Sequence, residues 1–497
     1  MNIDLDFSLL IPEFIVIAAA MAVLMADAFT TDLDGEPDAG DPRGLTAWLS
    51  FGGCAAAIVW ICVFLWDAGA QTSFNHALVV DRFALFFKVV VLLGAGLSVL
   101  LSDAWMTHQR LRSGASHALM LLATVGMMFM VSAGDLVTLF LGLEIMSIPI
   151  YCLAASLRWD DRSTEAGVKY LVLGSFGTAI FLFGLALMYA YVGIEAGPTL
   201  RIDLIREAIL ATPDAKPLYL VGGGLFVLVG LLFKMSAAPF HMWTPDVYEG
   251  APTAITAYMS VAVKATAAAA VVRIFGGGVL EYLNLEGLVW GIAALTMIIG
   301  NVMALTQSNV KRMLAYSSIA HGGYILVGVL ASSGDAEAGV LYYALAYTVG
   351  NMAAFSVLVF LSRRGHDVET FDQLRGLGTQ YPLVGVVMTI AMLSLIGMPP
   401  FAGFFGKLTI FKAAVSEGYI GLTLLALITS AVSVAYYLRP LIAMFMRESL
   451  EAPRPADAFF GRLVLGMAVA TAATVLLGVL PDQYLQWAAD SILASAR

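Results

Sequence analysis

The sequence predicts an all-α polytopic membrane protein with about fourteen transmembrane helices, arranged in part as two inverted five-helix repeats that each contain a broken helix. Hydrophobic residues make up 60% of the 497 residues and charged residues only 12%. The chain therefore has too few polar side chains to cover the surface of a soluble protein of this length. Apolar runs long enough to cross a bilayer recur along the chain. Two of these runs combine a lysine with an internal proline.

The apolar runs are expected to be helices. Each is continuously apolar over about 18 positions or more, without the every-second-residue alternation of a barrel strand. The expected spans lie near residues 8–28, 45–66, 82–101, 115–132, 135–157, 166–192, 218–240, 254–275, 286–307, 314–331, 337–361, 382–416, 419–445 and 462–484. Cys54, Cys62 and Cys152 fall in apolar runs without CxxC spacing, so they predict small core residues rather than a metal cluster or a disulfide framework.

Basic residues are divided unequally between the loops on the two sides of the predicted membrane. One side has fourteen: Arg43, Arg110, Arg112, Arg158, Arg162, Lys311, Arg312, Arg363, Arg364, Arg375, Arg439, Arg447, Arg454 and Arg462. The other side has six: Arg82, Arg201, Arg206, Lys216, Arg273 and Arg497. The positive-inside rule makes the first side cytoplasmic and places both termini on the outer side.

The remaining basic residues are all lysines inside apolar runs: Lys88, Lys169, Lys234, Lys264, Lys407 and Lys412. Arginine stays charged under almost all conditions, whereas burial can bring the pKa of a lysine into the range of proton exchange. A charge near the bilayer centre costs about 2.5–3.5 kcal/mol on insertion scales. The pattern therefore indicates a function in proton transfer, although Lys88 and Lys169 could snorkel to a surface and a structural role for Lys88 and Lys412 stays open.

Two ionisable residues lie near the middle of their spans. Lys264, in AYMSVAVKATAAAAVVR, is too far from either surface to reach the headgroups, and Glu144 lies mid-span in GDLVTLFLGLEIMSIPIYCL. A lysine beside Glu144 would favour both charges, and moving that lysine away would shift both pKa values. This is the physical basis of a proton switch.

Proline interrupts two spans close to a lysine. Pro239 follows Lys234 in LLFKMSAAPFHMW, and the pair at 399–400 precedes Lys407 in LSLIGMPPFAGFFGKLTIFKAAV. The backbone groups that proline frees must face protein or water in a membrane. Interrupted segments at corresponding positions of two halves indicate a transporter site built on inverted repeats.

The spacing of the breaks predicts the organisation of the chain. Residues 1–114 would hold helices one to three, 115–275 the first repeat with helices four to eight, 286–445 the second, inverted repeat with helices nine to thirteen, and 446–497 a loop and helix fourteen. His241 after the first break and His321 in YSSIAHGGYILVGVL are candidate proton carriers, because imidazole exchanges protons near neutral pH. A histidine that is only hydrogen-bonded to a neighbour is the alternative for both.

Four stretches together resemble a known family: FKMSAAPFHMWTPDVYEGAPT, SVAVKATAAAAVVRIF, NVKRMLAYSSIAHGGYILVG and MPPFAGFFGKLTIFKAA. They are similar to the antiporter-like membrane subunit N (subunit 2) of respiratory complex I, the proton-pumping NADH:quinone oxidoreductase. The resemblance covers nearly the whole chain. Related antiporter-like subunits often carry a glutamate where this chain has Lys407, which makes the resemblance specific.

The resemblance implies roles for individual residues. Glu144 would match the glutamate of the fifth helix, Lys234 its lysine partner on the seventh, Lys264 the central lysine of the eighth, and Lys407 the lysine of the twelfth helix that releases protons outward. Two further positions of the polar axis would be His241 and Lys169.

The resemblance also implies a setting: a multi-pass protein of the bacterial inner membrane, with both termini periplasmic, that transports protons. Its partners would be the lipid bilayer and other membrane-arm subunits, including further antiporter-like ones, and it would bind no nucleic acid. No cofactor is expected in this chain, because FMN, the iron–sulfur clusters and the quinone would belong to other subunits.

Two other functions are alternatives to this one. A subunit of an Mrp-type cation/proton antiporter would use the same helices and lysines without electron transfer, but Lys407 and the stretch TPDVYEGAPT favour complex I. A membrane scaffold without transport is disfavoured by the mid-membrane Glu144 and Lys264. The acidic stretch TDLDGEPDAGDPRG between the first two spans is most simply a solvated connection, which a peripheral partner could also use.

Overall fold

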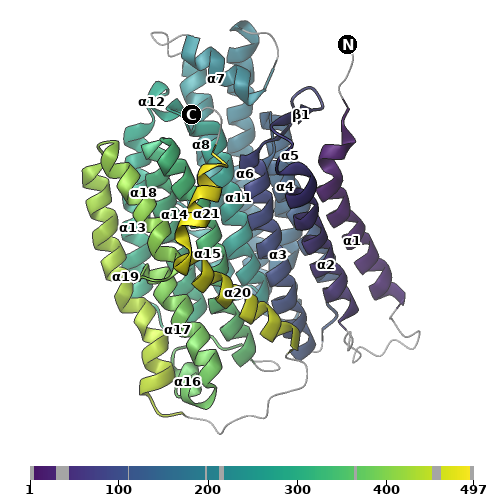
Figure 1. The fold of residues 1–497 in the computed structure, drawn as a ribbon, viewed down its shortest axis with the longest axis vertical. Helices are drawn as coiled ribbons and strands as arrows, with labels where there is room; N and C mark the ends of the chain where they lie inside the picture. Colours follow the sequence, from purple (N-terminus) through teal and green to yellow (C-terminus); the bar gives the residue numbers. More distant parts are fainter. Residues whose placement is uncertain are drawn as a thin grey trace.

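The computed structural model describes residues 5–29, 44–109, 111–195, 199–211, 218–362, 367–449 and 461–492. It is a bundle of long helices that run roughly side by side (Figure 1). The helices are α1 (Ile11–Phe29), α2 (Leu45–Trp60), α3 (Arg82–His108), α4 (Gly114–Val131), α5 (Leu136–Ala154), α6 (Asp161–Glu195), α7 (Ile202–Ala211), α8 (Leu218–Met235), α9 (Trp243–Gly250), α10 (Thr253–Tyr258), α11 (Lys264–Phe275), α12 (Val279–Tyr282), α13 (Glu286–Thr306), α14 (Val310–Ala331), α15 (Gly334–Leu361), α16 (Leu377–Gln380), α17 (Pro382–Ile396), α18 (Ala402–Ser416), α19 (Ile420–Met446), α20 (Gly461–Val479) and α21 (Pro481–Ala489). The shorter elements are the 3-10 helices η1 (Phe7–Leu10) and η4 (Asp372–Leu374), the π-helices η2 (Ile61–Leu65) and η3 (Met259–Val263), and the strands β1 (Gln71–Ser73) and β2 (Leu78–Val80).

The all-α membrane class is confirmed. The described part of the chain contains thirteen helices that are long and apolar enough to cross a membrane, and each coincides with one predicted span. The remaining predicted span, 382–416, consists of α17 and α18 with a break between them. The antiparallel hairpin of β1 and β2 was not predicted, because three-residue strands are too short for a periodic signal.

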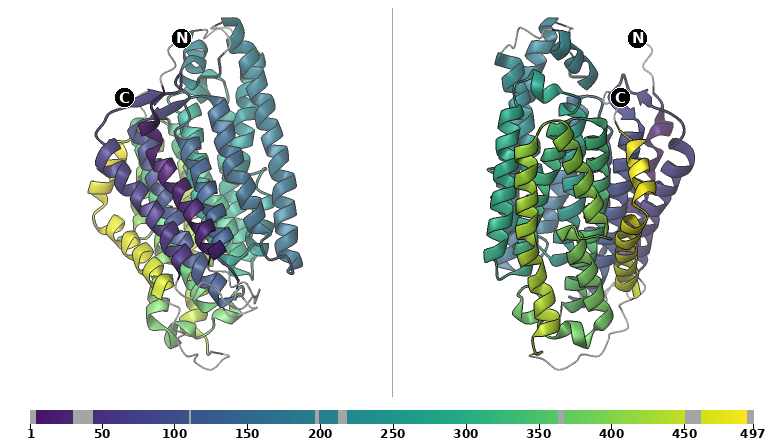
Figure 2. Two further views of the ribbon diagram at one scale, coloured as in Figure 1. Left: turned by 90° about the vertical axis from the view of Figure 1, so that its right-hand side faces the viewer. Right: turned by 60° about the vertical axis from the view of Figure 1, so that its left-hand side comes forward.

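The two ends of the bundle differ in what covers them. One end, here called the α7 end, carries α7 and the β hairpin, and the opposite end, here called the α16 end, carries α16 (Figures 1 and 2). Aspartate or asparagine side chains begin several spans by accepting a hydrogen bond from a backbone N–H of the first turn, as Asp135 does from Thr138 at 2.7 Å and Asn309 from Arg312 at 3.0 Å.

Four spans form the centre of the bundle. The continuous segment α10–η3–α11 and helix α14 are buried throughout their most apolar part, and α3 and α15 are buried nearly throughout. Outer helices such as α6 and α19 instead expose large apolar side chains, for example Phe176 and Leu424. Outward apolar surfaces suit lipid, so the polar side chains of the central spans are the ones that need an explanation.

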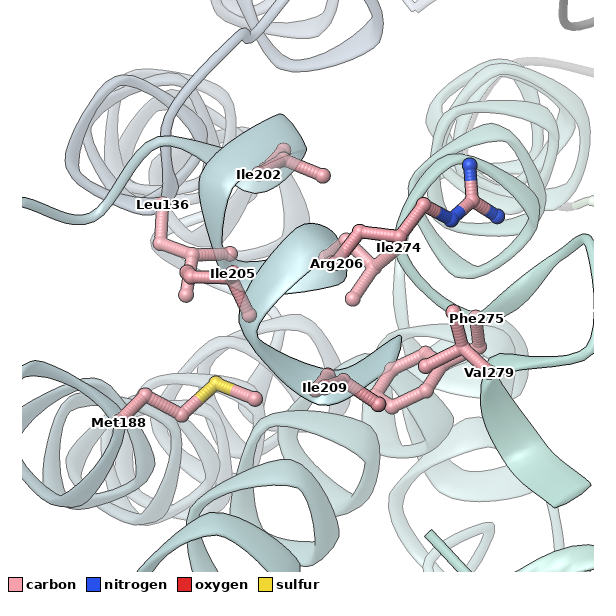
Figure 3. Close-up of a pocket in the computed structure, with 9 residues that line it drawn as sticks. All are labelled: Leu136, Met188, Ile202, Ile205, Arg206, Ile209, Ile274, Phe275 and Val279. Atoms are coloured by element: carbon pink, nitrogen blue, oxygen red, sulfur yellow. The ribbon is translucent and has the colours of Figure 1, made fainter. Parts of the chain in front are cut away.

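Helix α7 seals one end of the bundle with an apolar face. Ile202, Ile205 and Ile209 point from it toward apolar side chains of neighbouring helices, while Arg206 extends from α7 toward the helix that carries Ile274 (Figure 3) and donates to the carbonyl of Gly276. The hollow beneath this face has a volume of only about 10 Å³, which is room for one water at most. The contact is therefore packing, not a ligand site.

Several predicted placements were wrong. Arg273 and Arg439 lie inside helices α11 and α19 rather than in loops, and Arg273 is buried because Asp81 pairs with it at 2.8 Å. Cys62 and Cys152 are exposed on outer helices, and only Cys54 is a core residue. An apolar run does not reveal which of its faces points outward, so sequence placed all three cysteines alike.

Some predictions fall on residues that the structure does not describe. These are the acidic stretch up to residue 43 and seven of the basic residues used for orientation: Arg43, Arg110, Lys216, Arg363, Arg364, Arg454 and Arg497.

Lys88 does not snorkel to a surface. Its Nζ lies 2.7 Å from Oε1 of Glu13, and both side chains are completely buried between α3 and α1. Glu13 in the first turn of α1 carried no special signal in the sequence, because an acidic residue at a helix start is ordinary. The pair joins two helices of the predicted N-terminal unit, which favours the structural role for Lys88.

We expect Glu13→Ala to destabilise the protein strongly. It would leave the Lys88 ammonium buried without a partner, which costs about 3–5 kcal/mol. The check is the thermal inactivation temperature of the detergent-extracted protein together with its amount in membranes. Asp67→Ala, which removes an exposed ion pair with Arg82, is the matched control and should have little effect. Unchanged stability of Glu13→Ala would contradict a structural role for the pair.

Candidate functional site

Buried lysines mark the polar interior of the bundle. Lys234, Lys264 and Lys407 are each at most 5% exposed, and they lie on α8, α11 and α18. A buried ammonium needs polar partners to offset its lost hydration, so its partners show how each lysine is held.

Lys234 lies in the last turn of α8 and reaches α5. Its Nζ donates to Oγ of Ser147 at 2.8 Å and to the hydroxyl of Tyr151 at 3.1 Å, and the Tyr170 ring lies 5.4 Å away. These partners are neutral. Lys234 is thus held by hydroxyls and an aromatic ring. These neutral groups favour the protonated form of the lysine less strongly than a carboxylate would.

Glu144 lies on α5, one helical turn before Ser147, but not in an ion pair with Lys234. Among the described residues its Oε1 has no hydrogen-bond partner, and no ion pair within 4.0 Å involves it. The side chain is half-buried, and the flanking Ile145 and Ile148 are exposed. Glu144 therefore lies on a partly exposed side of α5, but its Oε1 is buried and is not paired with Lys234.

Lys264 is placed by a change in helix type. The π-helical turn η3 ends directly before it, and Lys264 begins α11. π-helical turns inside α-helices are frequent at functional sites. The Nζ of Lys264 donates to the backbone carbonyl of Ser318 on α14 and lies 5.9 Å from the centre of the Tyr347 ring. Gly322 on α14 lies beside this site and allows the end of α8 to approach closely, because a Cβ there would lie 3.1 Å from the carbonyl oxygen of Met235.

His321 connects the surroundings of the central lysine with those of Lys407. Its Nδ1 is hydrogen-bonded to the hydroxyl of Tyr343, and its Nε2 lies 2.9 Å from the hydroxyl of Tyr437. The imidazole also packs against the Tyr347 ring at 4.8 Å, the same ring that faces Lys264. An imidazole whose two ring nitrogens are both hydrogen-bonded can accept a proton at one nitrogen and release a proton from the other.

Lys407 lies beside the break between α17 and α18. Because α17 stops at Ile396, its last carbonyls lack helical partners. The Nζ of Lys407 donates hydrogen bonds to the carbonyls of Leu395 and Ile396 at 3.1 and 2.8 Å, and to the hydroxyl of Ser430 at 2.9 Å. The Tyr324 ring lies 4.9 Å away. The break thus supplies the oxygens that make a buried cation tolerable.

The first break differs from the prediction in its position. Helix α8 ends at Met235, so Pro239 lies in a turn between α8 and α9 rather than inside a span. His241 is half-buried in this turn, and its Nδ1 has no hydrogen-bond partner in the described chain. Within the described chain no hydrogen bond joins the His241 side chain to Lys234, so the two residues lie near the same end of α8 without direct contact.

Lys169 belongs to a charge network at the α16 end of the bundle. Its Nζ lies 2.6 Å from Glu165 and 2.8 Å from Asp246, and Asp246 also accepts from Arg312 at 2.9 Å. Burial opposes the ionisation of Asp246, but these two cations outweigh it and hold the pKa of Asp246 below its usual range. Lys169 is therefore a permanently paired cation and differs from the three buried lysines.

Sequence reasoning missed most of the neutral groups around the lysines. These groups have buried side chains: the tyrosines at 151, 324, 343, 347 and 437 and the asparagines at 301 and 351. Asn301 illustrates their role, since its Nδ2 donates to Tyr324 at 3.3 Å and its Oδ1 accepts from Tyr436 at 3.1 Å. Buried asparagines in apolar helices were the available signal, because their amides must find partners.

The arrangement is suited to moving protons. It has three buried amines, an imidazole between two of them, and hydroxyl groups that accept and donate. Within the described residues no group of three or more His, Cys, Asp or Glu side chains is arranged to hold a metal ion.

Known proteins share this chain's sequence and fold. A family model described as NADH:quinone oxidoreductase/Mrp antiporter, TM, matches residues 133–433. The NADH-quinone oxidoreductase subunit N of Trichlorobacter lovleyi is 40% identical over 494 residues, covering 98% of this chain and 97% of that protein. A chain in the structure of respiratory complex I from Thermus thermophilus with bound aureothin is 32% identical, with a TM-score of 0.78 over 96% of this chain and 98% of that chain. A chain of the Mrp complex from Dietzia sp. DQ12-45-1b has the same TM-score at 20% identity, covering 96% of each chain, which shows a common fold alone.

We expect Gly403→Ala to disrupt the second break. A Cβ at position 403 would lie 1.9 Å from the carbonyl oxygen of Ser394, so α17 and α18 would have to separate at a cost of about 1–3 kcal/mol, moving the carbonyls that hold Lys407. The measurement is protein abundance together with NADH-driven proton uptake in inverted membrane vesicles. Gly421→Ala, where a Cβ meets nothing within 4 Å, should behave as wild type. Wild-type behaviour of Gly403→Ala would show that the close contact is not needed.

Proposed function

Because the chain belongs to the family of NADH-quinone oxidoreductase subunit N, the antiporter-like subunit in the membrane arm of proton-translocating complex I, we propose that its buried lysines carry the transported protons. The observation that carries this proposal is the succession of Lys264, His321 and Lys407. The Tyr347 ring lies beside both Lys264 and His321, and the Tyr324 ring lies beside both His321 and Lys407. Electron transfer from NADH to quinone takes place in other subunits and would drive the transport.

Orientation follows from the distribution of charge. The described basic residues of the predicted cytoplasmic loops, such as Arg162, Arg312 and Arg447, lie at the α16 end. The positive-inside rule supports placing this end in the cytoplasm and both termini in the periplasm of a bacterial inner membrane. We infer further that the two breaks belong to two inverted repeats, since each lies beside a buried lysine that faces a tyrosine ring.

The proposed transfer has three stages. A proton from the cytoplasm reaches Lys264, passes through the hydrogen-bonded His321 to Lys407, and leaves to the periplasm. Carbonyls at the break hold Lys407 while it is charged, and they bind a neutral amine less well, so a change at the break would favour release. Moving one elementary charge against about 100 mV requires about 2.3 kcal/mol, which is on the scale of one charge-assisted hydrogen bond.

Glu144 and Lys234 would control the transfer. A protonated Lys234 that stays with Ser147 and Tyr151 adds positive charge to the interior and so disfavours protonation of Lys264. If Lys234 is drawn toward Glu144, the carboxylate offsets its charge and protonation of Lys264 is disfavoured less. Glu144 lies on a half-exposed face beside apolar side chains, where another membrane-arm subunit would cover it. A change in that neighbouring subunit could thereby act on Lys264 through Glu144 and Lys234.

Replacing the central lysine tests the proposal. Lys264→Met should lower NADH-driven proton uptake in inverted vesicles at least about tenfold, because a positioned proton-transfer group commonly contributes roughly 100-fold or more, and NADH:quinone activity should fall with it. Lys412→Met is the matched control, since Lys412 is exposed on the same helix as Lys407. Normal uptake and activity in an assembled Lys264→Met complex would exclude Lys264 from the path.

A second substitution separates charge from proton exchange. Lys264→Arg keeps a cation, but arginine does not release its proton under these conditions. We expect it to lose proton uptake to the same extent as Lys264→Met, at equal amounts of assembled complex. Full uptake with arginine would mean that the position needs a charge and not an exchangeable proton.

A further inference from the structure

A charged cavity opens at the α16 end of the bundle, between the two halves of the chain. Its volume is about 580 Å³, and it is bounded by α3, the α5–α6 connection, the start of α10, the start of α14 and the segment 367–373. The charged residues that line it are Asp160, Asp161, Arg162, Lys311, Asp367 and Glu369. Four acids against two bases give the cavity a negative lining, which attracts protons and repels anions.

Asp367 lies in this cavity with each carboxylate oxygen engaged by a different helix. Oδ1 accepts from Nε1 of Trp105 on α3 at 2.8 Å, and Oδ2 accepts from the hydroxyl of Thr253, the first residue of α10. Nζ of Lys311, which is 2% exposed, lies 4.0 Å from Oδ2. The carboxylate is therefore only 12% exposed yet in contact with the cavity.

The backbone around Asp367 is fixed to α14. The N–H of Val310 donates to the carbonyl of Glu369 at 2.6 Å, and Lys311 donates to the carbonyl of Ala251 at 2.9 Å and lies 3.8 Å from Glu369. These contacts tie the segment after α15 to the residues directly before α10. Asp367 is thus held at the cytoplasmic end of the span that carries Lys264.

Polar groups continue from Thr253 toward the central lysine. Lys264 follows Thr253 by eleven positions, roughly 16 Å along a helix. Ser260 lies between them, and its Oγ accepts from Nδ2 of Asn351 at 2.6 Å. The same amide lies 3.4 Å from the hydroxyl of Tyr347, whose ring faces Lys264.

We propose that this cavity is where cytoplasmic protons enter the chain, and that Asp367 with Thr253 passes them along the polar side of α10 to Lys264. This inference rests on the proposed function, because it identifies the cytoplasmic supply of the same lysine. The neighbouring cavity of about 140 Å³ around Lys169 is a poorer entrance, since the side chains that line it include the paired Lys169, Asp246 and Arg312.

The test uses Asp367→Asn in the assembled complex. The amide keeps the size of the carboxyl group but cannot take up a proton. We expect NADH-driven proton uptake and NADH:quinone activity to fall about tenfold, less than the roughly 100-fold of a fully lost transfer group because water still enters the cavity. Added imidazole, whose cation is a small weak acid that a negative lining attracts, should restore much of both rates by delivering protons in place of Asp367, whereas it should not restore Lys264→Met.

Two variants control for structure. Asp367→Glu keeps a carboxylate and should retain most of the activity, and Asp372→Asn changes an exposed carboxylate of the same segment and should behave as wild type. Normal uptake in Asp367→Asn would overturn the inference, and so would a loss that neither imidazole nor Asp367→Glu restores. If Lys264→Met itself pumps normally, the proposed function fails as well; if only Lys264→Met is defective, the entrance alone is wrong.

Discussion

The central constraint on this fold is the burial of lysine ammonium groups in a low-dielectric bundle without a carboxylate beside them. Lys234 is held by two hydroxyls, Lys264 by a backbone carbonyl, and Lys407 by two backbone carbonyls and a hydroxyl, and a tyrosine ring lies beside each. These partners are neutral, so they stabilise the cation without the full charge of a carboxylate. Lys88, in contrast, is held by Glu13 at 2.7 Å, and a directly paired carboxylate favours one charge state. The partner chemistry thus distinguishes the lysines proposed to carry protons from Lys88.

Irregular backbone supplies part of these partners. The last carbonyls of a helix lack helical partners, and the end of α17 offers those of Leu395 and Ile396 to Lys407. Lys264 differs, because it donates to the carbonyl of Ser318, which lies inside the continuous helix α14. The π-helical turn η3 directly precedes Lys264 and sets where its side chain leaves the helix. A helix break thus holds one of these lysines, whereas a carbonyl shared with a neighbouring helix holds another.

Much of this could be predicted from the sequence, for identifiable reasons. Hydropathy located every described span, because a lipid solvent imposes a long apolar run on each crossing helix. Lysines and prolines inside such runs stand out, so Lys264 and Lys407 were found as candidates. Pairings were not predictable: Glu13 and Lys88 are 75 positions apart in the chain, and nothing in either helix indicates that they meet. The same limit hid Tyr343 and Tyr437, whose meaning depends on the position of His321 between them.

The position of Glu144 shows what the chain leaves to its neighbours. A carboxylate at mid-span on a half-exposed, apolar face is unfavourable in lipid, and its Oε1 has no partner within the described chain. The three buried lysines, by contrast, have all their partners within this subunit. In the proposed mechanism, the group that would respond to another subunit therefore lies toward the edge of the bundle and the proposed proton carriers lie in its centre. Lys234, with Ser147 and Tyr151, lies on α8 and α5 between them. Such coupling through Glu144 would need no movement of the central helices, because a change of charge at the edge acts on buried amines through the low dielectric of the interior.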